Sequence, residues 1–241
     1  MSPDAATQPP PPQQPLLASP APVPSWPRYA LPVFAAVGVL NLVFEAAGSH
    51  VAFGLTKPLL MPLLALAILA RGRVTSRLLL AALLGSTLGD TMLLFSGTWF
   101  LVGMAGFAAT HVCYVSLFVR AGVLRRNRGR FALATIGYGV VWAVLISRLW
   151  SGLDTDLRIP VACYSLLLAS MATCSFAAGR RTALGSALFL LSDTMIAGGL
   201  AHWHTPRGTG FSIMVTYILA QYLLATGCMS VFSQRRRRQG K

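Results

Sequence analysis

The chain is dominated by a succession of apolar runs, each about 20 residues long and separated from the next by a short polar break. The runs lie at 29–47, 51–70, 78–96, 99–119, 131–150, 159–178, 182–200 and 211–232. An apolar helix of about 20 residues crosses the hydrocarbon core of a bilayer, so each run is long enough to be a transmembrane helix. Charged residues make up only 11% of the chain, whereas a soluble domain carries about 25%. The sequence therefore predicts an all-α, polytopic membrane helix bundle of about eight transmembrane helices.

The basic residues are distributed unequally between the two sides of this predicted bundle. With eight spans, one side carries nearly all of them, in clusters at Arg28, at Arg71, Arg73 and Arg77, at 120–130, at Arg180 and Arg181, and at 235–241. The other side carries only Arg148, Arg158 and Arg207. Because short cytoplasmic loops are enriched in Lys and Arg, we expect both termini in the cytoplasm. The same placement explains the net charge of +14, and we do not expect nucleic acid as a partner.

Two segments flank the predicted transmembrane domain, which covers 28–233. Residues 1–27 hold most of the 15 prolines, together with Gln, Ala and Ser, and they include no basic residue. This composition is typical of a disordered tail and not of a signal peptide, so we expect a Pro-rich cytoplasmic tail. Residues 234–241 are expected to form a basic cytoplasmic tail that anchors the topology. The four cysteines lie inside apolar runs without CxxC spacing, which indicates packing.

A short pattern occurs twice, in the third and seventh runs. Leu84-Gly85-Ser86 precedes Asp90, and Leu184-Gly185-Ser186 precedes Asp193. The two runs have the same predicted direction, which favours a four-plus-four parallel repeat of the kind found in some transporters. The spacing Gly85-x-x-x-Gly89 also predicts a face on which another helix packs closely.

Three of the six acidic residues, Glu45, Asp90 and Asp193, lie inside the apolar runs. A carboxylate at membrane depth costs about 2.5–3.5 kcal/mol, so its presence indicates a function unless a structural role explains it. Asp90 and Asp193 lie at equivalent depths in their runs, roughly 16–18 Å from the inner boundary at the helical rise per residue. We therefore expect them to face one another across a shared cavity.

Other polar side chains lie at similar depth, and each has a structural alternative. Lys57 and Glu45 either belong to the site or neutralise each other within the bundle. His111 either belongs to the site or bonds to a backbone carbonyl in the core. Gln221 either belongs to the site or joins two helices by hydrogen bonds. The pair His202 and His204 lies in an outer loop without further ligands, and we expect neither a metal nor a cofactor.

Several of these residues fall in segments that together form a pattern. The segments are Thr56-Lys57-Pro58-Leu59, Gly89-Asp90, Phe107 to Tyr114 with His111, Tyr164 to Met171, Gly185 to Asp193, and Tyr217 to Gln221. In their order and spacing they resemble the YhhN family of integral membrane proteins, the lysoplasmalogenases. This resemblance covers nearly all of the predicted membrane portion and leaves out the Pro-rich tail and the loop around His202.

The resemblance implies a membrane hydrolase that cleaves the vinyl ether bond of lysoplasmalogen-type lipids, releasing a fatty aldehyde and a glycerophospho-base. Its substrate is then a lysophospholipid from the bilayer, and its membrane is expected to be the bacterial cell (inner) membrane. Asp90 and Asp193 are the expected catalytic pair. The expected substrate-binding residues are Lys57, Glu45, His111, Tyr114, Tyr164, Tyr217 and Gln221.

The chemistry of vinyl ethers agrees with a pair of buried carboxyl groups. Protonation of the β-carbon gives an oxocarbenium ion, water captures it, and the resulting hemiacetal collapses to aldehyde and alcohol. One carboxylic acid and one carboxylate divide this work, as they do in glycosidases, while Lys57 meets the lipid phosphate. The alternative is a membrane transporter or lipid carrier, for which intramembrane acids and a parallel repeat are equally natural.

Overall fold

The structure is a computed structural model that describes residues 29–71 and 76–239, with side chains as far as residue 233. The described residues form helices and turns and no strand. The helices are α1 (Ala30–Ala46), α2 (His50–Thr56), α3 (Leu60–Ala70), α4 (Arg77–Met92), α5 (Thr98–Arg120), α6 (Val123–Arg126), α7 (Arg128–Leu149), α8 (Thr155–Ala178), α9 (Arg180–Leu200) and α10 (Thr209–Gln239), and a 3₁₀ turn η2 (Lys57–Leu59) joins α2 to α3.

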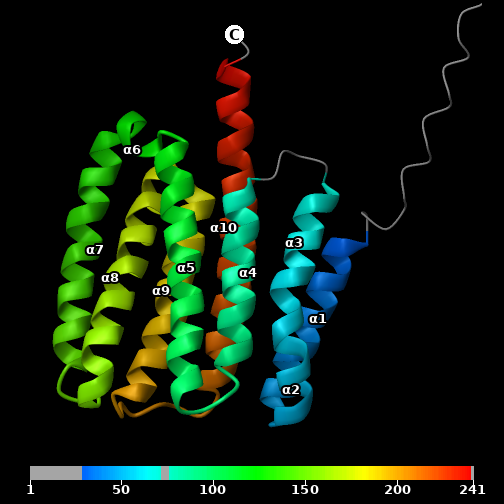
Figure 1. Ribbon diagram of the computed structural model, residues 1–241, viewed down its shortest axis with the longest axis vertical. Coiled ribbons are helices and arrows are strands. Elements are labelled where there is room, and N and C mark those ends of the chain that lie inside the picture. Colours follow the sequence, from blue (N-terminus) through cyan, green and yellow to red (C-terminus); the bar gives the residue numbers. More distant parts are fainter. Residues whose placement is uncertain (1–28, 72–75, 240–241) are drawn as a thin grey trace, which may run out of the picture.

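The long helices run side by side in one bundle (Figure 1). Helices α7 and α8 lie at one edge, and α1, α2 and α3 lie at the other. Between them stand α4, α5, α9 and α10, with the α4–α5 and α9–α10 hairpins packed most extensively. Many large apolar side chains point outward, among them Leu133, Ile136 and Val140 of α7. An apolar exterior of this kind suits a bilayer, so the chain is an integral membrane protein.

The predicted runs and the observed helices agree closely in position. Within the described residues, six helical segments are long and apolar enough to cross a membrane: His50–Ala70, Thr98–Arg120, Arg128–Leu149, Thr155–Ala178, Arg180–Leu200 and Thr209–Ser233. Helix α1 is apolar but has 17 residues, and α4 has 16 residues and contains Arg77 and Asp90. The all-helical membrane bundle is confirmed, while the count of eight spans stays a prediction.

The helix ends have local causes. Ser76 caps α4, with its hydroxyl accepting from the backbone N–H of Leu78 at 3.2 Å. The third run is predicted to extend to residue 96, but α4 stops at Met92. A turn follows it, in which Gly97 has φ 69°. Glycine adopts this left-handed conformation without strain. The predicted tail 1–27 lies outside the described residues, and the backbone of α10 continues as a helix through most of the predicted tail 234–241.

The second run is a broken helix. Pro58 has no backbone N–H, so the chain tightens into the turn η2 between α2 and α3. Asn41 of α1 holds this break from the side: its Nδ2 donates to Thr56 Oγ1 at 2.9 Å and to the carbonyl of Phe53 at 3.3 Å. The break matters because Lys57 is its first residue.

Glycines let two helix pairs approach closely. A Cβ on Gly106 of α5 would lie 2.9 Å from the carbonyl oxygen of Gly85 and 2.9 Å from the amide nitrogen of Gly89, both on α4. This confirms the close packing face predicted from the Gly85–Gly89 spacing. In the second pair, a Cβ on Gly185 of α9 would lie 2.9 Å from the amide nitrogen of Leu224 on α10. The proposed internal repeat stays a prediction, although both halves use a glycine in this way.

Candidate active site

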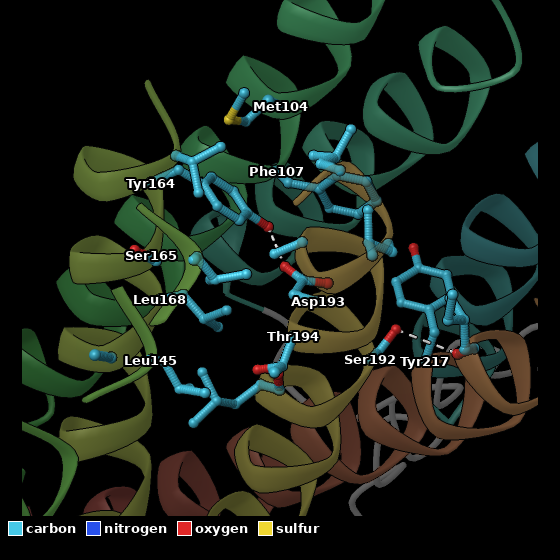
Figure 2. A pocket seen from close by; sticks show the side chains of 18 of the residues that line it. Met104, Phe107, Leu145, Tyr164, Ser165, Leu168, Ser192, Asp193, Thr194 and Tyr217 are labelled. Atoms are coloured by element: carbon cyan, nitrogen blue, oxygen red, sulfur yellow. Dashed lines mark hydrogen bonds between the residues drawn. The ribbon is translucent and has the colours of Figure 1, made fainter. Parts of the chain in front are cut away.

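A single cavity contains both intramembrane aspartates. It lies among α4, α5, α7, α8, α9 and α10, with Lys57 of η2 at its margin. Its lining comes from the half of the long helices that lies away from the C-terminal end of α10, around the carboxyl-terminal half of α9. Figure 2 shows Asp193 between Tyr164 on one side and Tyr217 on the other.

Asp90 is almost completely buried, with 1% of its surface exposed, near the carboxyl-terminal end of α4. Tyr217 of α10 donates its hydroxyl proton to Asp90 Oδ2 at 2.6 Å. The ring of Phe107 packs over the neighbouring Gly89, where a Cβ would lie 2.5 Å from the ring. Phe107 also meets the ring of Tyr217 edge to face, with 5.8 Å between centroids. These contacts fix the tyrosine and therefore the carboxyl group that it binds.

Asp193 has a tyrosine partner of its own. Tyr164 of α8 donates its hydroxyl proton to Asp193 Oδ2 (Figure 2). The imidazole Nε2 of His111, on α5, lies 3.2 Å from the same hydroxyl oxygen. His111 is fully buried and its ring packs edge to face on Phe189 at 5.0 Å. Each aspartate thus uses Oδ2 for a tyrosine from another helix, and within the described residues Oδ1 of each makes no protein hydrogen bond.

A buried polar network extends from the first of these pairs. Gln221 Nε2 donates to Ser86 Oγ at 2.8 Å, and Gln221 Oε1 accepts from Tyr114 at 3.2 Å. Ser86 Oγ lies 3.1 Å from Thr110 Oγ1, which donates to the carbonyl of Ala82 at 2.9 Å. All of these side chains are buried on α4, α5 and α10. Buried polar groups that are fully paired make the helix arrangement unique, so this network fixes α4, α5 and α10 relative to one another.

Lys57 faces the cavity, and Glu45 does not line it. The Lys57 ammonium lies 5.6 Å from the centroid of the Phe53 ring and interacts electrostatically with Asp90 and Asp193. Glu45 lies instead against the start of α10, where a Cβ on Gly210 would collide with its Oε1. No ion pair joins Lys57 to Glu45 in the described part of the chain, so of the two alternatives the structure places Lys57 with the aspartates.

The residues expected to bind substrate therefore occupy three kinds of position. Lys57, Tyr164 and Tyr217 line the cavity with the two aspartates. His111, Tyr114 and Gln221 stand behind it, in hydrogen bonds to its tyrosines or to each other. Glu45 lies apart. The described residues hold no group of three side chains that could bind a metal, and the loop with His202 and His204 contributes nothing to the cavity.

The apolar part of the cavity is not among the sequence-based predictions. One wall of it is α7, which contributes Tyr138, Val141, Trp142, Leu145, Ile146 and Leu149. These positions recur every three to four residues and so occupy one face of the helix. That spacing could have indicated a lining face, but in a helix that is apolar all round it is not distinctive. The indole Nε1 of Trp142 donates to Ser165 Oγ at 3.0 Å and ties this wall to α8.

The fold and the cavity define a class of protein: a polytopic helical membrane protein with two carboxyl groups and a lysine in a largely apolar intramembrane cavity. The chain belongs to the YhhN family, whose pattern it matches over residues 52–228. This match includes every cavity-lining residue.

Curated relatives are mammalian proteins named lysoplasmalogenase TMEM86B. The human protein is 31% identical over 154 residues, which are 64% of this chain and 64% of the human protein. The pig protein is 34% identical over 169 residues, which are 68% of this chain and 71% of the pig protein. The rat protein is 29% identical over 173 residues, 72% of this chain and 70% of its own. The alignments thus span about two thirds of the relatives' length. No solved structure matches the chain.

Proposed function

We propose that the chain is a membrane hydrolase that cleaves the vinyl ether bond of lysoplasmalogen-type lipids to a fatty aldehyde and a glycerophospho-base. The observation that carries the proposal is the pair of carboxyl groups, Asp90 and Asp193, each held by a tyrosine in one apolar cavity. The name shared by the curated relatives supports the same reaction. Lysolipids have one hydrocarbon chain and reach such a cavity from within the bilayer.

The reaction needs a proton donor and a base, and the cavity offers two carboxyl groups. One, as the acid, protonates the β-carbon of the vinyl ether, and the other, as the carboxylate, stabilises the oxocarbenium ion and takes a proton from the attacking water. The hemiacetal formed in this way collapses to aldehyde and alcohol. Because Tyr164 and Tyr217 occupy one oxygen of each carboxyl group, the other oxygen of each is available to the substrate.

Replacing the aspartates tests this mechanism. Asp90→Asn and Asp193→Asn should each lower kcat by about 10²–10⁴-fold on a vinyl ether lysolipid, because each removes an acid–base group. The double variant should be scarcely worse than either single one, since the two groups act as a unit. Activity against pH should be bell-shaped, and proton transfer to carbon should give a solvent deuterium isotope effect.

The measurement is aldehyde release by purified protein, with the saturated ether lysolipid as the unreactive comparison. Asp156→Asn is the matched control, because Asp156 is exposed at the start of α8 and away from the cavity. An asparagine variant at either cavity position that keeps more than about a tenth of wild-type kcat contradicts the two-aspartate mechanism. Lipid transport into proteoliposomes without aldehyde release would establish the carrier alternative instead.

A further inference from the structure

The cavity has a polar end and an apolar arm. At the polar end are Lys57, Asp90 and Tyr217, and the turn η2 that carries Lys57 packs against α4. The arm lies between α7, α8 and α9, on the far side of Asp193. In Figure 2 the apolar side chains Leu145 and Leu168 lie beside Asp193, on the side opposite Tyr217. Asp193 therefore stands where the polar end meets the arm.

The arm follows the helices over a considerable length. On α9 its lining runs from Leu190 to Leu200, which is about 15 Å at the helical rise per residue. On α8 it includes Val161 and Leu168. A separate hydrophobic cluster that contains Leu149, Leu153, Val161 and Ala201 adjoins one end of the arm, towards the loop between α7 and α8.

The arm is also the part of the cavity nearest the lipid. Helix α7 stands at the edge of the bundle (Figure 1) and buries only Ala134 and Leu149. Val141 lines the cavity while 42% of its surface is exposed, so the arm lies close to the outer surface of the bundle there. The side chains around it on α7 are apolar, which suits entry of a hydrocarbon chain from the bilayer.

We propose that the arm between α7, α8 and α9 binds the hydrocarbon chain of the lipid, and that the lipid lies with its phosphate at Lys57. The proposal rests on the proposed function, because it takes a single-chain phospholipid as the ligand. In such a lipid the phosphate, glycerol, ether oxygen, α-carbon, β-carbon and chain follow one another in this order. The cavity presents Lys57, Asp90, Asp193 and the arm in the same order. The opposite direction would bury the phosphate in the arm, where the described lining beyond Asp193 has no charged side chain.

This direction of binding assigns the two aspartates. The β-carbon carries the chain, so it lies beside Asp193, which gives it a proton as the O–H bond breaks and a C–H bond forms. Water then attacks the α-carbon and loses a proton to Asp90, on the side of the ether oxygen. When the hemiacetal collapses, its hydroxyl proton returns to Asp193, and Asp90 protonates the departing glycerol oxygen. Both carboxyl groups then have their starting protons.

Narrowing the arm tests where the chain binds. Ala197 lines the arm one turn after Asp193, so Ala197→Phe should lower kcat/KM by about tenfold or more for a long-chain vinyl ether lysolipid, the size expected from overpacking. A short-chain substrate that ends before the added ring should lose much less. Ala143→Phe is the matched control, because Ala143 is exposed on α7 outside the cavity, and it should behave as wild type on both substrates. An equal loss at both chain lengths, or no loss at either, overturns the proposal.

Photo-crosslinking with a saturated ether lysolipid tests the same point without turnover. A diazirine on the chain should label α7, α8 or α9, and a diazirine on the headgroup should label the neighbourhood of Lys57, both in competition with unlabelled lipid. The reverse pattern, or labelling that unlabelled lipid does not reduce, overturns the direction of binding. If wild type shows the expected labelling but releases no aldehyde from any vinyl ether, the proposed function fails and the binding site stands.

Azide separates the roles of the aspartates. In Asp90→Ala, azide should restore consumption of the vinyl ether, because it captures the oxocarbenium ion at the α-carbon and needs no base. In Asp193→Ala, azide should restore nothing, because the cation does not form without the acid. Rescue of Asp193→Ala instead, or of neither variant, contradicts the assignment.

Discussion

At the scale of single residues, the two carboxyl groups differ in what supports them. Tyr164 gives its one hydroxyl proton to Asp193, so its oxygen accepts from His111, which places the imidazole proton on Nε2. The Nδ1 atom of His111 is then a buried acceptor, without a partner among the described residues. Asp90 is instead linked through Tyr217 to the amide of Gln221, 3.5 Å from the tyrosine oxygen. The tyrosine that binds Asp193 thus contacts an ionisable side chain, His111. The tyrosine that binds Asp90 contacts the neutral amide of Gln221.

Lys57 is the residue that we expect to bind the phosphate. Lys57→Met should raise KM much more for a phosphate-bearing vinyl ether lysolipid than for a phosphate-free vinyl ether, because only the first loses an ion pair. Loss of one charged hydrogen bond of about 1.5–3 kcal/mol corresponds to roughly 10–100-fold. Steady-state kinetics on the two substrates measure the difference.

Glu45→Gln supplies the comparison for this prediction. Because Glu45 lies against Gly210 and not with Lys57, it should leave both KM values nearly unchanged, and adding it to Lys57→Met should restore nothing. Restoration by the double change would show that the two residues serve only to balance each other. An equal rise of KM on both substrates would remove the phosphate role of Lys57.

The sequence revealed some of these residues and concealed others. Asp90 and Asp193 could be recognised because acids are rare in the chain and costly in a membrane. Their tyrosines could be named through the family resemblance, but not paired, since Tyr217 and Asp90 lie 127 positions apart and only the packing of α10 on the bundle brings them together. Glu45 is also a carboxyl group inside a predicted transmembrane run, so the sequence alone does not separate it from the aspartates. The structure places it outside the cavity.

At the scale of helices, close packing between α4 and α5 positions Asp90. Gly106→Ala should destabilise the protein by about 1–3 kcal/mol, because its Cβ would lie 2.9 Å from backbone atoms of Gly85 and Gly89 that cannot move independently. Gly137→Ala on α7 is the matched control, since nothing lies within 4 Å of its Cβ. It should be neutral or stabilising by roughly 0.5–1 kcal/mol, the helical preference of Ala over Gly.

Thermal unfolding in detergent, followed by the amount of protein that stays monodisperse, compares these two variants with wild type. Similar unfolding temperatures for Gly106→Ala and Gly137→Ala would show that α4 and α5 can separate without loss of stability.

The Gly85–Gly89 spacing indicated this packing face from the sequence. The broken helix at Pro58 was less evident, because the run 51–70 contains two prolines, Pro58 and Pro62, and only Pro58 lies in the turn that carries Lys57.

For the whole molecule, hydrophobic run length predicted the bundle because the bilayer sets one length for every helix. It could not predict which helices would be neighbours. The α4–α5 hairpin follows directly from the short connection between the two runs, whereas the contact of α5 with α8, and of α1 with α10, depends on side-chain packing that run length does not encode. The apolar arm is a product of that packing, which explains why it was missed.

The orientation of the bundle is a prediction that the distribution of charge makes testable. Reporter fusions after Arg73, Arg126, Arg181 and Lys241 should all report the cytoplasm, and fusions near Asp154 and Trp203 should report the opposite side. The physical reason is that the basic clusters alternate with connections that carry few basic residues, and positive loops are retained in the cytoplasm. Helix α4 decides the outcome, because at 16 residues it is the shortest pass and it contains Asp90. If α4 fails to cross, fusions on its two sides report the same compartment and every later position inverts. An outside signal after Arg126 or Arg181 would therefore contradict eight spans.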